Sequence, residues 1–199
     1  MISAALILLL TTIAISLAAF RNPELLDRLM LHPDQVYYDR RWYQMLTCGF
    51  VHGNGMHLGV NMLSFFFFAF PLEQYLGSVG LVTLYLASIV LANISTVFEH
   101  KDDPNYASLG ASGGVSAVVF SYILFEPGTK LYLFFIPIGI PAIIYAVGFV
   151  AYSYFAGSRT TGINHKAHLW GALSGILLTV LLSPEIRGEL FRGVGGLGH

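Results

Sequence analysis

Charged residues are scarce in this sequence. Asp, Glu, Lys and Arg together make up 11% of its 199 residues, whereas hydrophobic residues make up 55%. Because a water-soluble domain carries about 25% charged residues, this chain lacks the polar surface to face water on all sides. The formal net charge of −1 provides no basic surface, so no nucleic-acid partner is expected. The composition predicts an integral membrane protein that contacts the lipid bilayer.

Cysteine and basic N-terminal residues are also nearly absent. A single cysteine, Cys48, excludes a disulfide within the chain. The apolar run at residues 2–20 has no Lys or Arg before it, which a secretory signal peptide would have. A run of about 20 apolar residues is enough to cross a bilayer. We therefore expect this run to be a retained transmembrane helix.

Six apolar runs of this kind divide the chain. They lie at about residues 2–20, 57–76, 79–98, 111–125, 131–156 and 167–183. Segment 21–56 mixes charges with aromatic residues and predicts an interfacial loop with short amphipathic pieces. Pro137 and Pro141 fall inside the fifth run, where neighbouring helices would accommodate a kink. The expected fold is all-α: a single polytopic membrane domain over residues 1–199 with six transmembrane helices.

Polar residues occur at the start of three of these runs. They are His57 and Asn61 in the second run, Ser112 in the fourth and His168 in the sixth. Consecutive spans alternate in direction, so these three runs are parallel and begin on the same side of the membrane. Since polar groups inside a span usually face the bundle interior or a wet cavity, we expect the four side chains to converge.

A serine, two histidines and an asparagine suit acyl transfer. One histidine can activate the serine as a base, while the other histidine and the amide donate hydrogen bonds to an oxyanion. Small residues around them would let two helix backbones approach closely; these are Gly110, Gly113, Gly171 and Gly175. Packing alone could also explain the glycines, but a histidine one turn before a GxxxG pattern favours a functional site.

The letters Gly-x-Ser-x-Gly at residues 110–114 also match the nucleophile elbow of soluble α/β hydrolases. An elbow requires a strand immediately before the serine, above a parallel sheet. The run that precedes Gly110 is long enough to span a membrane and does not predict such a strand. The match to the elbow is therefore accidental.

Three motifs resemble the rhomboid family of intramembrane serine proteases, over residues 40–183. They are Gly110-Ala111-Ser112-Gly113, Ala167-His168 followed by Gly171 and Gly175, and His52, His57 and Asn61 at the spacing H-x4-H-x3-N. The resemblance implies a six-helix rhomboid-like bundle with Ser112 as the nucleophile and His168 as general base and then acid. It also implies an oxyanion hole formed by the Ser112 backbone N–H with the side chains of His57 and Asn61.

The same resemblance implies a function. The expected activity is that of a serine endopeptidase that cleaves single-span membrane proteins in or near their transmembrane segment. No cofactor and no metal would take part in this chemistry. The expected location is the bacterial inner (plasma) membrane, where the chain would be a multi-pass protein.

Two positions depart from the family pattern. Gln44 stands where relatives often have an arginine in the first loop. Ser116 stands four residues after the nucleophile, where many relatives place a Tyr or Phe ring against the catalytic histidine. Phe120 or Trp170 could support the imidazole of His168 instead.

Two other function classes stay open. A rhomboid-like protein without protease activity would bind membrane helices, although such relatives typically lack the serine and histidine that are present here. A zinc membrane hydrolase could use four histidines, namely His52, His57, His165 and His168. Against the zinc site, no HExxH motif occurs, and no acidic residue lies near these histidines in the predicted spans.

The basic residues are distributed unevenly between the two sides of the predicted bundle. Seven lie on the side of the predicted dyad: Arg21, Arg28, Arg40, Arg41, Lys101, Arg159 and Lys166. Three lie on the other side: Lys130, Arg187 and Arg192. The positive-inside rule places the richer side in the cytoplasm, whereas the family resemblance implies a dyad that faces outward. We adopt the family orientation as the expectation.

Overall fold

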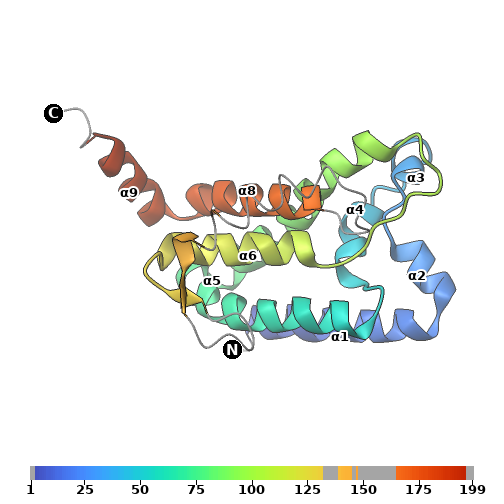
Figure 1. Ribbon diagram of the computed structural model, residues 1–199, viewed down its shortest axis with the longest axis horizontal. Coiled ribbons are helices and arrows are strands. Elements are labelled where there is room, and N and C mark those ends of the chain that lie inside the picture. Colours follow the sequence, from blue (N-terminus) through green and yellow to red (C-terminus); the bar gives the residue numbers. More distant parts are fainter. Residues whose placement is uncertain (1–2, 132–138, 145–146, 148–164, 196–199) are drawn as a thin grey trace.

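The computed structural model describes residues 3–131, 139–144, 147 and 165–195, and this part of the chain is mostly helical (Figure 1). Its elements are α1 (Ala4–Arg21), α2 (Pro23–Leu29), α3 (Pro33–Tyr37), α4 (Gln44–Thr47), the 3₁₀ helix η1 (Cys48–Phe50), α5 (Gly55–His100), α6 (Ser112–Phe125), β1 (Lys130–Leu131), β2 (Ile140–Pro141), α8 (His165–Leu182) and α9 (Pro184–Gly195). The predominance of helix confirms the predicted all-α class. The number of membrane spans stays a prediction.

Helix α5 joins the second and third predicted spans in one element. Its 46 residues would measure about 69 Å if the helix were straight, more than twice the roughly 30 Å of a bilayer's hydrocarbon core. Gly77 interrupts it with a φ of 69° and a ψ of 168°, a conformation that glycine adopts readily. The break between the predicted spans 57–76 and 79–98 is therefore a kink at Gly77. Both α1 and α5 are long and apolar enough to cross a membrane.

Helices α6 and α8 are parallel and touch backbone to backbone (Figure 1). A Cβ atom added to Gly171 would lie 2.8 Å from the Cα of Gly113, and one added to Gly175 would lie 2.5 Å from the Cα of Ala117. One turn further along, the hydroxyls of Ser121 and Thr179 lie 2.5 Å apart. The contacts advance by four residues on both helices, so the helices run in the same direction at a constant register.

The second half of α5 packs against another side of α6. A Cβ atom added to Gly113 would lie 2.8 Å from the Cβ of Ala92, and one added to Gly114 would lie 2.7 Å from the ring of Tyr85. Tyr85 is fully buried and Ile89 nearly so. The start of α6 is thus enclosed by α5 on one side and by α8 on another, and glycines make both approaches possible.

The N-terminus of α1 is fixed by a glutamate that sequence reasoning did not single out. The carboxylate of Glu73, on α5, accepts hydrogen bonds from the backbone N–H groups of Ala4 (2.8 Å) and Ala5 (3.2 Å). It also accepts the hydroxyls of Ser3 and Ser78. The first N–H groups of a helix have no partner within it, and an anion near them is favoured by the helix dipole. Glu73 therefore caps α1 and ties it to the region of the α5 kink.

The predicted fifth span is wrong at its beginning. Lys130–Leu131 pairs in antiparallel fashion with Ile140–Pro141, and the N–H of Ala142 donates to the carbonyl of Thr129 at 2.9 Å. Residues 131, 140 and 141 are thus extended, and Pro141 is not a kink inside a helix. Proline has no N–H and clashes with the preceding helical turn, which disfavours a helix through this segment. The rest of the predicted span 131–156 lies mostly outside the described residues.

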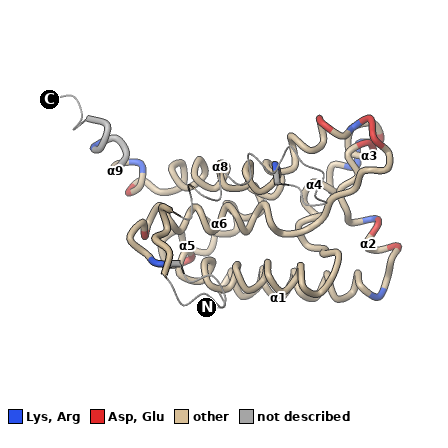
Figure 2. The backbone as a smooth tube through the Cα atoms, viewed as in Figure 1, with Lys and Arg blue, Asp and Glu red and all other residues tan. Residues whose placement is uncertain are grey.

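Charges gather at the two ends of the described bundle and are sparse along its middle (Figure 2). At one end lie α2, α3 and the loop after α5, with acidic and basic residues interleaved. At the other end lie β1 and α9. The segment between α1 and α5 is built from the short helices α2, α3, α4 and η1. The middle of the described bundle therefore carries few charges, as a bilayer interior requires.

Candidate active site

Ser112 is the first residue of α6 and is half-buried. The preceding Gly110 has a φ of 116°, a conformation that L side chains rarely adopt, and Ala111 is the N-cap residue. The N–H of Gly110 donates to the carbonyl of Cys48 at 2.9 Å. Since the N-terminal N–H groups of a helix lack partners within the helix and lie at its positive end, the start of α6 suits a developing negative charge.

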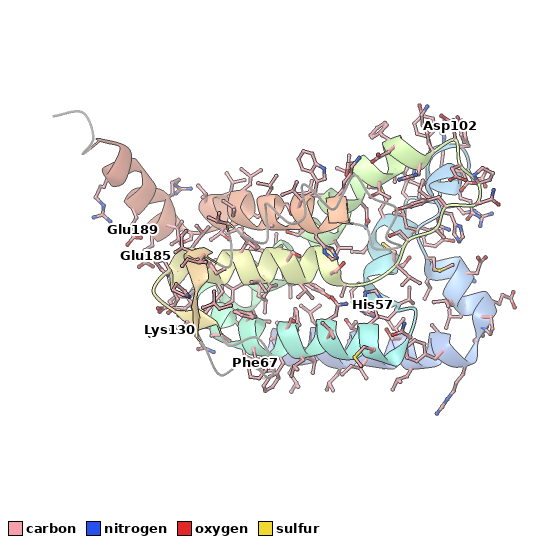
Figure 3. The ribbon with its side chains drawn as sticks, viewed as in Figure 1. His57, Phe67, Asp102, Lys130, Glu185 and Glu189 are labelled. Atoms are coloured by element: carbon pink, nitrogen blue, oxygen red, sulfur yellow. The ribbon has the colours of Figure 1, made fainter. Side chains whose placement is uncertain are left out.

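His57 lies against the backbone of Gly110. A Cβ atom added to Gly110 would be 2.6 Å from Cε1 and 2.8 Å from Nε2 of the His57 ring. The N–H of His57 donates to the side chain of Asn54 at 2.8 Å, which caps the start of α5. Figure 3 shows His57 at this end of α5, beside the loop that leads into α6. The His57 ring therefore lies beside Gly110, two residues before Ser112.

Asn61 is buried one turn further along α5. Its side-chain Nδ2 donates to the carbonyl of His57 at 3.0 Å. An amide NH₂ group carries two hydrogens, and this bond uses one of them. The bond also fixes the orientation of the amide on the same helix face as His57.

His168 lies in the first turn of α8 and is half-buried. Two residues that flank His168 on α8 contact Gly113, the residue after Ser112. Gly171 touches the backbone of Gly113, and a Cβ atom added to Gly113 would lie 3.6 Å from the carbonyl of Ala167. The segments that carry Ser112 and His168 are thus in direct contact. An ion pair between Lys166 and Glu99, at 2.5 Å, joins the start of α8 to the end of α5.

The two positions that depart from the family pattern are both buried. Gln44 accepts a hydrogen bond from the N–H of His32 at 3.1 Å and donates to the side chain of Gln35 at 2.9 Å. It therefore links α4 to α3 and to the residue before α3. Ser116 is 8% exposed and lies within α6. Phe120 is buried, whereas Trp170 is half-exposed, at 48%.

His52 belongs to a motif that the sequence identifies, but the sequence did not predict its hydrogen-bond partner Ser16. Ser16, on α1, lies 2.9 Å from Nδ1 of His52 and donates to the carbonyl of Phe50 at 2.9 Å. The N–H of Ala111 donates to Nε2 of His52 at 3.3 Å. Ser16 and His52 are both fully buried. The signal for Ser16 was a polar residue inside an apolar run, which does not identify its partner.

Two of the four histidines that a zinc site would use lie close together. The rings of His52 and His57 lie edge to face with centroids 5.0 Å apart. Among the residues whose side chains are described, no group of three or more His, Cys, Asp or Glu could hold a metal ion. The side chain of His165 lies outside the described part of the chain.

These features define a class of protein: an apolar helical bundle that places a serine at a helix N-terminus against a histidine-bearing helix. Residues 39–185 match the family model of the rhomboid domain. The chain belongs to the rhomboid family, whose members are integral membrane proteins, and the expected family is confirmed.

The chain is similar to relatives from bacteria and from a plant organelle. It is 30% identical over 140 residues to the rhomboid protein YdcA of Bacillus subtilis, which covers 70% of this chain and 67% of that protein. It is 32% identical over 151 residues to Rhomboid-like protein 11, chloroplastic, of Arabidopsis thaliana, covering 71% of this chain but only 53% of that protein. It is 27% identical over 152 residues to Rhomboid protease GlpG of Haemophilus influenzae, covering 75% and 74% respectively.

Proposed function

We propose that this protein is an intramembrane serine endopeptidase that uses Ser112 and His168 as a catalytic dyad. The observation that carries the proposal is the backbone contact between Gly113 and Gly171, next to the serine and one turn from the histidine. A serine hydroxyl is short, so it reaches a base on another helix only if the two backbones nearly touch. Membership of the rhomboid family supports the same assignment.

The proposed reaction is acyl transfer to the serine followed by hydrolysis. The Ser112 oxygen attacks the carbonyl carbon of the scissile peptide bond while His168 takes the hydroxyl proton and then delivers it to the leaving amine. Water, deprotonated by His168, next attacks the acyl carbon; the ester bond to Ser112 breaks, the second product leaves as the carboxylic acid, and His168 returns the proton to the Ser112 oxygen. Neither step requires a cofactor or a metal.

The oxyanion of each tetrahedral intermediate would be held at the start of α6. The proposed donors are the Ser112 N–H and the side chains of His57 and Asn61. Loss of one such donor typically reduces the rate by about 10²–10³. The Gly110 backbone under the His57 ring allows that ring to lie near the nucleophile, because a side chain there would displace it.

The proposed substrates are single-span membrane proteins, and the proposed location is the bacterial inner (plasma) membrane. The scarcity of charges in the middle of the described bundle and the family support a site reached from the bilayer. Bacterial relatives support the location, while the chloroplast relative shows that the family also occurs in organelles.

The test is cleavage of a single-span substrate by the full chain reconstituted in lipid vesicles. We expect Ser112→Ala and His168→Ala to lower cleavage at least about 10³-fold, because either change removes the activated nucleophile. Ser116→Ala, a matched loss of a hydroxyl one turn away, should retain activity. A fluorophosphonate should label wild type at Ser112 and neither dyad variant.

Three outcomes would contradict the proposal. Full cleavage by Ser112→Ala would exclude the dyad. Loss of wild-type cleavage on metal chelation would favour the zinc hydrolase. Binding of the substrate helix without any cleavage or labelling by wild type would identify a non-proteolytic rhomboid-like binder.

A further inference from the structure

A chain of hydrogen bonds connects helix α1 to the residue before the proposed nucleophile. A backbone N–H can only donate, so Nε2 of His52 must accept the bond from Ala111. The proton of the neutral imidazole then sits on Nδ1, which donates to the Ser16 hydroxyl oxygen. That hydroxyl donates in turn to the carbonyl of Phe50. With these protons in place, the Ala111 N–H, the His52 ring, the Ser16 hydroxyl and the Phe50 carbonyl all have a hydrogen-bond partner.

The environment of His52 favours this neutral form. The side chain is fully buried, and burial together with the neighbouring His57 lowers the pKa of His52 from 6.5 to about 4. A protonated ring would carry a hydrogen on Nε2. That N–H would face the N–H of Ala111, and two donors cannot form a hydrogen bond with each other. The hydrogen-bond chain is therefore complete only when His52 is uncharged.

Residues 48–52 bind the N–H groups of the two residues that precede Ser112. Cys48 accepts from Gly110 through its carbonyl, and His52 accepts from Ala111 through its ring. The two bonds hold the peptide units on either side of Gly110, which sets where α6 begins and in which direction its first N–H groups point. Ser16 fixes the ring that makes the second bond.

We propose that His52 is a positioning residue of the candidate active site, which links the loop before Ser112 to helix α1 through Ser16. The inference rests on the proposed function, because it gives the link a catalytic purpose. Without the bond to Ala111, the loop can move and the Ser112 oxygen and N–H lose their alignment. A displacement of about 1 Å at a catalytic group is enough to cost about 10²-fold in rate.

The experiment compares four variants of the full chain in vesicles by kcat, KM and thermal stability. We expect His52→Leu to lower kcat about 10²-fold with little change in KM, and Ser16→Ala to lower kcat about tenfold. His52→Gln should recover most of kcat, since its amide oxygen can accept from Ala111 and its NH₂ can donate to Ser16.

Ser121→Ala is the matched control. It also removes a buried hydroxyl that pairs with another helix, but at the far end of α6 from the loop. We expect it to lower the melting temperature about as much as Ser16→Ala while leaving kcat unchanged. If kcat falls in Ser121→Ala in proportion to stability, or if His52→Leu keeps wild-type kcat, the positioning role is wrong.

A measurement without substrate separates this inference from the proposed function. Hydrogen–deuterium exchange at Ala111 should accelerate at least about tenfold in His52→Leu and Ser16→Ala, and not in Ser121→Ala. If wild type cleaves substrate and exchange at Ala111 is unaffected by these changes, only the inference fails. If wild type cleaves nothing, the proposed function fails, and the exchange rates still decide whether His52 holds the loop.

Discussion

Two kinds of joint hold the described bundle together. Helices α6 and α8 meet through glycine backbones, with no polar side chain needed where Gly171 touches Gly113. Helix α1 is instead held at both ends by buried polar side chains: Glu73 binds its first N–H groups, and His52 binds Ser16 near its other end. The contact between α6 and α8 requires residues without a side chain, whereas the contacts of α1 require particular hydrogen-bond donors and acceptors.

This difference predicts how each joint fails. A backbone contact cannot adapt to an added side chain, so a substitution there should damage stability and the proposed site together. A polar joint can be removed without moving the helices far, so its effects should depend on what it holds. Glu73 binds the start of α1 and Ser78 near the α5 kink, whereas His52 binds the loop before Ser112.

The largest effect is expected at the glycine joint. Gly171→Val would place a Cβ atom 2.8 Å from the Cα of Gly113, and backbone cannot yield as a flexible side chain can. We expect a loss of about 3 kcal/mol or more in the free energy of unfolding and cleavage at background level. Gly59→Ala is the control, because a Cβ atom there meets nothing within 4 Å. Wild-type stability of Gly171→Val in thermal or denaturant unfolding would refute this close contact.

The next effect concerns the carboxylate joint. Glu73→Ala leaves two buried N–H groups and two hydroxyls without their acceptor, and we expect a loss of about 3 kcal/mol in stability. The kcat of the folded fraction should not change, since Glu73 lies about 24 Å along α5 from His57. Ser78→Ala keeps the carboxylate and should cost about 1 kcal/mol. A fall in kcat at wild-type stability would show that the two ends of α1 are coupled.

The sequence predicts the glycine joint better than the polar ones. The runs predicted at 111–125 and 167–183 correspond closely to α6 (Ser112–Phe125) and α8 (His165–Leu182), because apolar runs bounded by polar or breaking residues have a local signature. The family motifs also locate the candidate serine and histidine. The roles of these residues stay predictions.

The polar joints have no such local signature. Ser16 and Glu73 are single polar residues in apolar helices, and their partners lie 36 and about 70 positions away in the chain. Which atoms they meet depends on how the helices pack, which periodicity does not specify. The pairing of β1 with β2 escaped prediction for a related reason: an apolar segment with two prolines fits a kinked helix as well as a strand.

A pH-dependent effect of about 2 kcal/mol should distinguish the contact of His52 with α1 from that of Glu73. His52 has a pKa of about 4 when folded and about 6.5 when unfolded, so between these values the unfolded chain binds a proton that the folded chain does not. Stability due to this group is therefore full above pH 6.5 and decreases as the pH falls towards 4. Between pH 7 and pH 5 we expect wild type to lose about 2 kcal/mol more than His52→Gln, which cannot titrate.

The measurement is the free energy of unfolding in mixed micelles at both pH values. His57 is the titratable side chain that faces His52, and it is present in both proteins, so its own contribution largely cancels. Equal losses in the two proteins would mean that the buried neutral imidazole does not hold this end of α1.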